Sequence, residues 1–151
     1  MSKTIQRILL GLLIALVISQ FFQIDKTQPP SDGNADFMAL LAPPADVAEI
    51  LKTSCYDCHS YKTKYPWYTS VAPISWWIGH HIKEGREHLN FSEWGAYSDK
   101  QKKHKLEECW EEVEKHKMPL NSYLWVHKAA KLSEEQAATL INWFKAKEKA
   151  S

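Results

Sequence analysis

The chain has 151 residues, 44% of them hydrophobic and 25% charged, with a formal net charge of +1 at pH 7. This near-neutral balance gives no support to nucleic-acid binding, which depends on clustered positive charge. The length suits one domain with a modest core. Seven Trp residues suit either a core built around a large flat apolar ligand or a Trp-rich core without one.

Residues 1–24 differ in composition from the rest of the chain. Lys3 and Arg7 precede a mainly apolar segment at 8–24, whose 17 residues are about the minimum for one membrane crossing. No Ala-x-Ala cleavage site follows, so we expect an uncleaved membrane helix rather than a cleaved signal peptide. The basic residues predict a cytoplasmic N-terminus, which places the remaining chain on the periplasmic side of the cytoplasmic membrane.

The next segment, residues 25–42, is expected to be a tether between this helix and a domain at 43–151. Its stretch KTQPPSDGN at 26–34 has Pro, Gly, Ser and charge but no apolar periodicity. A short amphipathic helix is then predicted to begin at Pro43-Pro44 and to run into Cys55. Residues 61–73 hold two prolines and several aromatic residues, which indicates an irregular loop.

Three longer helices are predicted in the second half of the chain, and no strand pattern appears. Apolar residues recur at helical spacing from Ile74 to about Leu89. Capping boxes then mark two helix starts, at Ser98 with Gln101 and at Ser133 with Gln136. Their predicted buried stripes are Leu106, Cys109, Trp110 and Val113 in the first helix, and Ala137, Leu140, Ile141 and Phe144 in the second. Cys109 on such a stripe is expected to be a small buried hydrophobe.

The pentapeptide Cys55-Tyr56-Asp57-Cys58-His59 carries the most specific chemistry in the chain. C-x-x-C-H is the sequence at which haem is attached in c-type cytochromes. Its two thiols add to the vinyl groups of one porphyrin, and its histidine supplies the proximal iron ligand. One motif predicts one covalently attached haem c.

Three other kinds of chemistry could use the same residues. A thioredoxin-like redox pair needs a preceding strand, and the chain offers a helix instead. A zinc site needs a second ligand pair, but Cys109 stands alone. A structural disulfide between Cys55 and Cys58 would leave His59 unexplained.

The sixth iron position is predicted to be filled by Met118. Apart from Met38, it is the only methionine beyond residues 1–24, and Pro119 keeps it in a loop after a helix. A thioether is a soft donor that raises the reduction potential of haem iron. The rival ligand is His81, on the apolar face of the helix from Ile74, and an open or water-bound position is the remaining alternative.

Arg86 lies near the end of the same helix. Its guanidinium could pair with a haem propionate, because its fork matches a carboxylate. A solvated surface arginine is the competing interpretation.

Three stretches of the chain resemble the bacterial haem-binding domain family of small, membrane-anchored c-type cytochrome-like proteins. They are CYDCHS at 55–60, YPWYTSVAPISWWIGHHIKEGREHLNFSEW at 65–94, and KMPLNSY at 117–123 with His127 beyond it. More distantly, the chain is similar to class I cytochromes c, although its Trp-rich segment at 65–94 is not part of that pattern. The resemblance implies thioether links at Cys55 and Cys58, with His59 and Met118 as axial ligands.

The predicted fold is therefore all-α, a cytochrome c-like helical domain wrapped around one haem and preceded by an N-terminal membrane helix. The predicted function is one-electron transfer between redox partner proteins, without enzymatic activity. A haem-based gas or redox sensor, or a haem-binding module with a labile distal ligand, is the alternative. A small peroxidase is less favoured, because the sequence assigns no distal acid/base pair.

Overall fold

The computed structural model describes residues 2–150, and every regular element within that range is helical. The prediction of an all-α protein is therefore confirmed. The elements, in chain order, are α1 (Lys3–Ser19), η1 (Gly33–Ala35), α2 (Phe37–Leu41), α3 (Ala45–Ser54), α4 (Tyr56–His59), η2 (Trp67–Ser70), α5 (Ile74–His88), η3 (Phe91–Ala96), α6 (Asp99–Glu114), α7 (Asn121–Leu124), η4 (Lys128–Ala130) and α8 (Glu134–Lys149).

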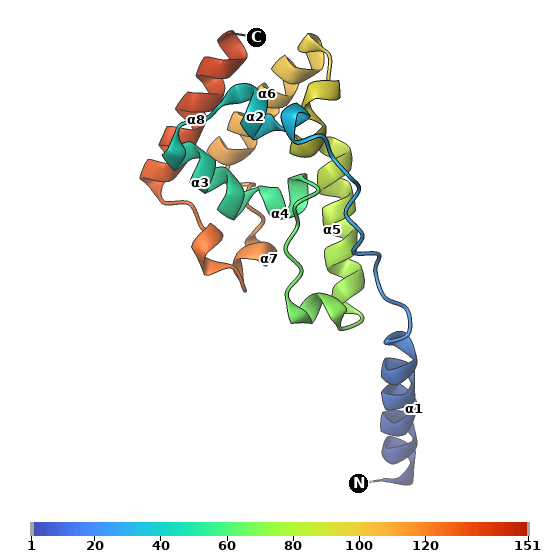
Figure 1. The fold of residues 1–151 in the computed structure, drawn as a ribbon. Coiled ribbons are helices and arrows are strands. Elements are labelled where there is room, and N and C mark those ends of the chain that lie inside the picture. The colour runs from blue at the N-terminus through green and yellow to red at the C-terminus, as the bar shows by residue number, and fades with distance from the viewer. Residues whose placement is uncertain (1, 151) are drawn as a thin grey trace.

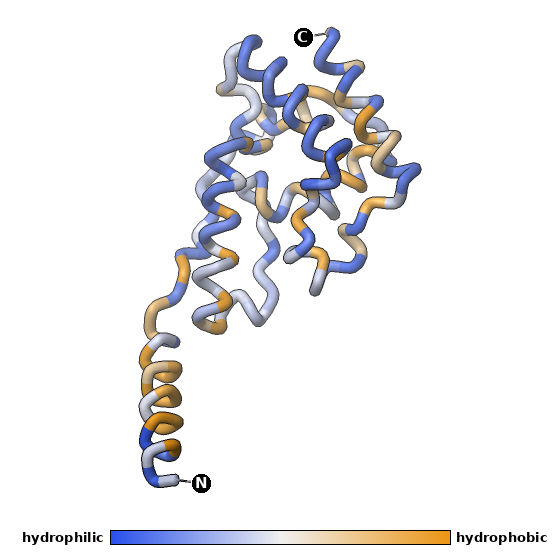
Figure 2. Tube along the Cα trace, turned by 180° about the vertical axis from the view of Figure 1, so that it is seen from behind, coloured by the Kyte–Doolittle hydropathy of each residue, from blue (hydrophilic) through white to orange (hydrophobic). Residues whose placement is uncertain are grey.

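Helix α1 projects away from a body formed by the other elements (Figure 1). Its side chains are almost all exposed and mostly apolar, as the hydropathy colouring of Figure 2 makes visible. The sequence predicts a membrane-spanning helix over residues 1–24. Among the described residues, however, no helix is both long enough and apolar enough to cross a membrane, so the spanning part of that prediction is not supported.

Local sequence signals mark where two of the long helices begin. Ser98 and Ser133 each cap a helix through a complete capping box with the glutamine three residues later. The two helices that follow, α6 and α8, lie side by side (Figure 1). Between them, Trp110 Nε1 donates to Glu148 Oε2 at 2.9 Å, and Lys145 Nζ lies 2.9 Å from Glu114 Oε1.

Helix α6 ends before Pro119 can interrupt it. His116 has a φ of 52°, in the left-handed region, and the N–H groups of Lys117 and Met118 both donate to Glu112 O. Such a left-handed residue after the last turn is a common way to satisfy free carbonyls. Met118 therefore lies in a loop, as predicted.

The core is an aromatic cluster centred on Phe37. Its ring centroid lies 4.7 Å from those of both Phe91 and Trp94, and Tyr56 of α4 stacks on Phe91 at 5.1 Å. Tyr56 also donates from its hydroxyl to the buried carboxylate of Asp36, at 2.9 Å. The packed region thus includes residues that the sequence assigns to the tether at 25–42.

Candidate haem-attachment site

The C-x-x-C-H segment forms a single helical turn directly after α3. Cys55 separates the two helices, and its carbonyl accepts from the N–H groups of Cys58 at 3.2 Å and His59 at 3.0 Å. Cys55 packs against the hydrophobic core, whereas Cys58 lines an apolar pocket.

Both sulfurs of the motif are thiols at neutral pH. Burial, with the neighbouring Cys58 as a smaller cause, raises the pKa of Cys55 to about 12. Burial and the charge of Asp57 raise the pKa of Cys58 to about 11. Catalytic redox cysteines and zinc ligands are instead stabilised as thiolates. Residues 2–150 also form no group of three or more potential metal ligands, and all three cysteines are free.

His59 is oriented by the C-terminal end of α5. Its Nδ1 lies 3.0 Å from Gly85 O and 3.1 Å from Leu89 O. Since a carbonyl oxygen can only accept, Nδ1 carries the proton and the lone pair is on Nε2. Burial lowers the pKa of His59, which favours the neutral ring. A neutral imidazole whose other nitrogen is held by carbonyls is the usual state of a metal-ligating histidine.

Gly85 allows α5 to lie against this turn. A Cβ atom placed at Gly85 would come within 2.9 Å of Cys58 O and within 3.4 Å of Cys58 Cβ. Any side chain there would force the backbones of α4 and α5 apart. The glycine thus sets the distance that lets His59 reach two carbonyls at the end of α5.

Asp57, between the two cysteines, connects the motif to distant parts of the chain. Its carboxylate accepts from the Tyr123 hydroxyl at 2.8 Å and from the Lys64 backbone N–H at 3.0 Å. Its carbonyl accepts from Thr63 Oγ1 at 2.7 Å. The motif is therefore held both by the loop that follows it and by α7.

An apolar pocket, here called the Cys58 pocket, opens beside the motif. Its walls come from α4, the loop at 63–69, α5 and the segment at 120–127, and they include Cys58, Pro66, Tyr68, Trp77, Ile78, His81, Leu120, Tyr123, Val126 and His127. The pocket volume is about 80 Å³. Typical ligand pockets are about 300–1,000 Å³. Cys58 lines this pocket, whereas Cys55 and His59 do not, and the pocket as it stands is too small to hold a porphyrin.

The two predicted candidates for the sixth ligand lie in different surroundings. His81 lines the Cys58 pocket, half-buried, with Nδ1 2.9 Å from Trp77 O and its ring 4.4 Å from the Trp77 ring. Met118 is also half-buried, but it does not line this pocket, whereas Leu120 does. Ligation by Met118 stays a prediction.

Arg86 is not the solvated surface residue that one interpretation predicts. Its Nε donates to Ser60 O and its Nη2 to Thr63 Oγ1, both at 2.9 Å, and its guanidinium lies over the Tyr61 ring. It holds the loop that follows His59. Pairing of Arg86 with a propionate stays a prediction.

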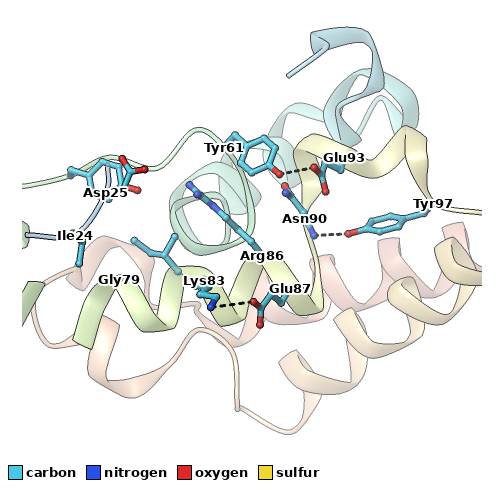
Figure 3. Close-up of a pocket in the computed structure, with 12 residues that line it drawn as sticks. Ile24, Asp25, Tyr61, Gly79, Lys83, Arg86, Glu87, Asn90, Glu93 and Tyr97 are labelled. Atoms are coloured by element: carbon cyan, nitrogen blue, oxygen red, sulfur yellow. Dashed lines mark hydrogen bonds and ion pairs between the residues drawn. The ribbon is translucent and has the colours of Figure 1, made fainter. Parts of the chain in front are cut away.

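Arg86 also lines a larger pocket of about 510 Å³ (Figure 3). Several of the other polar groups there are paired with one another. Glu93 accepts from the Tyr61 hydroxyl at 2.5 Å, Lys83 lies 3.8 Å from Glu87, and Tyr97 accepts from the Asn90 N–H at 3.0 Å. We assign no ligand to this pocket.

Sequence reasoning missed a cluster of side chains next to the motif. Tyr68 OH lies 2.8 Å from His127 Nε2, and the Tyr123 ring stacks on the His127 ring with centroids 3.9 Å apart. The spacing of Tyr123 and His127, four residues apart, is a helical signal that could have indicated this stacking. The pairing with Tyr68, 59 residues away, has no local signal.

Comparison with known proteins gives one match. No curated protein and no solved structure matches this chain. The family model described as "Haem-binding domain" matches residues 14–146, which include the C-x-x-C-H turn, the Cys58 pocket and Met118. Because this match covers most of the 151 residues, the chain belongs to the haem-binding domain family.

Proposed function

We propose that the protein is a mono-haem c-type cytochrome that carries single electrons between redox partner proteins and catalyses no reaction of its own. The observation that carries the proposal is the state of His59 within the motif turn. Its Nδ1–H donates to Gly85 O and Leu89 O, so Nε2 keeps an unshared electron pair that can bind a metal ion. Haem, when bound, would supply an iron that alternates between the ferrous and ferric states.

The chain's own residues have distinct tasks in this proposal. Cys55 and Cys58 would hold the porphyrin through thioether bonds, and His59 would bind its iron. Met118 is proposed as the second axial ligand. Asp57, through Tyr123 and Lys64, keeps the motif turn in place. A rigid site suits electron transfer, because little has to rearrange when the charge on the iron changes.

We further propose that the chain is exported and held at the periplasmic face of the cytoplasmic membrane by residues 1–24. The exposed apolar side chains of α1 support this location, since such a helix gains free energy by entering a bilayer interface. Anchoring would raise the effective concentration of the protein near membrane-bound partners.

The alternative is a haem-based sensor or binding module. It is favoured by the polar groups of His81, His127 and Tyr68 in the Cys58 pocket, which could contact a small molecule bound to the iron. Carbon monoxide separates the two functions. A six-coordinate electron carrier excludes it from the ferrous protein, whereas a sensor with a labile distal ligand binds it readily.

The direct test of the proposal is retention of haem after unfolding. Protein matured in a host with the attachment machinery should keep its haem through acid-acetone extraction and denaturing electrophoresis. Cys55→Ala and Cys58→Ala should each leave one weaker link, and the double variant should release all haem. Cys109→Ala is the control, and its retention should equal that of the wild type. Release of all haem from the wild type would overturn covalent attachment.

A further inference from the structure

Large apolar side chains are exposed on one end of the body. The most exposed are Trp67 at 79% and Trp125 at 72%, and the whole set, here called the Trp face, is Trp67, Ile74, Trp76, Trp77, Trp125 and Val126. These residues come from η2, the start of α5 and the segment after α7. Two of them, Trp77 and Val126, line the Cys58 pocket, as does Pro66, which precedes Trp67. Exposed apolar patches of this kind mark interaction sites.

Two elements that carry part of the Trp face, η2 and the start of α5, lie at the end of the body nearest α1 (Figure 1). Gln20 exchanges two 3.0 Å hydrogen bonds with the backbone of Ala72, and Trp76 Nε1 donates to Phe22 O. Lys26 Nζ lies 2.6 Å from Ser70 Oγ. These contacts join the segment that follows α1 to η2 and the start of α5, which carry part of the Trp face.

Acidic residues are distributed unevenly along the chain, and they are absent from the stretches that contain the Trp face. Residues 1–24, 58–83 and 115–133 contain no Asp or Glu at all, whereas 84–114 contain nine of the 18 acidic residues. The acid-free stretches supply α1 and the Trp face, while α6 lies at the opposite end of the body (Figure 1). The exposed cations Lys64, Lys128 and Lys131 lie in these stretches.

We propose that the Trp face docks on a bilayer that contains anionic phospholipid, with the indole rings at the level of the headgroups. Trp is enriched at that depth because one end of its ring is apolar and the other donates a hydrogen bond. Lys side chains near such a surface are attracted by the negative charge of the lipid headgroups. Docking of this kind does not require α1 to cross the bilayer. The Cys58 pocket then faces the membrane, so the partners it can reach are lipid-soluble or membrane-embedded.

Hydroxyl-radical footprinting of the full chain on vesicles tests this inference, because residues 1–24 contain no Trp and cannot contribute to the signal. On vesicles with phosphatidylglycerol, oxidation of Trp67, Trp77 and Trp125 should fall several-fold relative to phosphatidylcholine alone. Trp110 and Trp143, on α6 and α8, should be unchanged. Salt at 1 M, where the Debye length is about 3 Å, should remove much of the difference.

A charge-reversal set provides the matched comparison. The triple variant Lys64→Glu, Lys128→Glu and Lys131→Glu should lose the protection that depends on phosphatidylglycerol. The control Lys100→Glu, Lys103→Glu and Lys149→Glu changes equally exposed residues on α6 and α8 and should keep it. Equal protection in the two triple variants would overturn the role of charge and with it the proposal.

The inference rests on the proposed membrane location but not on haem, and vesicle flotation separates the two. Protein that floats with vesicles while its Trp residues oxidise as in buffer overturns the docked face and leaves the location intact. Protein that does not float overturns both. Protection that rises with protein concentration and is the same without vesicles indicates a second copy on the Trp face, which also overturns the proposal.

Discussion

At Gly85, the addition of a single methyl group would disturb the C-x-x-C-H turn. A Cβ atom added there would approach the backbone oxygen of Cys58 to 2.9 Å, and backbone cannot give way as a flexible side chain can. Replacement by Ala normally stabilises a helix by about 0.5–1 kcal/mol relative to Gly. Here the forced separation of α4 and α5 should outweigh that gain.

We therefore expect Gly85→Ala to lower the free energy of unfolding by about 1–3 kcal/mol, the usual cost of overpacking. It should also lower the fraction of chains that retain haem, because His59 loses its partners Gly85 O and Leu89 O. Denaturant unfolding and haem stain measure the two effects. Gly33→Ala is the control, since no atom lies within 4 Å of its added Cβ. Equal stability of the two variants would contradict this account of Gly85.

The identity of the sixth ligand is also decided by single residues. With Met118 bound, ferric haem should show a weak long-wavelength charge-transfer band, and the reduced protein a strongly shifted methyl proton resonance. Met118→Ala should remove both signals and admit carbon monoxide. Met118→His should keep six-coordination and lower the reduction potential, because imidazole favours ferric iron more than a thioether does.

His81→Ala is the matched comparison for Met118→Ala. It should leave the spectrum nearly unchanged and lower stability, since His81 bonds Trp77 O and packs on the Trp77 ring. The reverse pattern would assign ligation to His81, which is the candidate that lines the Cys58 pocket.

At the scale of elements, α7 depends on the motif for its position. This four-residue helix is too short to be stable alone, and Tyr123 within it donates to Asp57 at 2.8 Å. Tyr123→Phe keeps the ring that stacks on His127 and removes only the hydroxyl. A hydrogen bond to a charged group contributes about 1.5–3 kcal/mol. We expect a loss near the low end of that range, because α7 is partly exposed.

Hydrogen exchange would locate this effect. Amides of residues 121–130 should exchange faster in Tyr123→Phe, while those of α6 and α8 should not change. Tyr65→Phe is the control, because no hydrogen bond of the Tyr65 hydroxyl is seen among residues 2–150. Faster exchange throughout the body would indicate a general loss of stability instead of release of α7.

Helices with local signals could be predicted, and contacts between distant residues could not. The capping boxes at Ser98 and Ser133 are complete within four residues, so sequence alone marks where α6 and α8 begin. Phe37 has no such signal: it follows a polar stretch, and only its distant partners Phe91 and Trp94 make it a core residue. The same limit applies to the site, where C-x-x-C-H is local but Tyr123 lies 66 residues from Asp57.

At the scale of the whole molecule, the two ends of the body differ in character. The end with α1 and the Trp face is apolar, aromatic and free of acidic residues over three long stretches, while α6 at the other end is rich in glutamate. A protein held by its apolar end would present the acidic end to the aqueous phase.

The last prediction concerns attachment through α1. Full-length protein in cells should begin at or near Met1 and should stay in the membrane fraction through a high-salt wash, since apolar burial does not depend on ionic strength. Leu12→Lys with Leu13→Lys, which puts charge on side chains that are 63% and 57% exposed, should release much of it. Leu40→Lys is the control, because the exposed Leu40 lies outside α1. An N-terminus near Gln20, with wild-type protein in the soluble fraction, would instead identify residues 1–24 as a cleaved signal peptide.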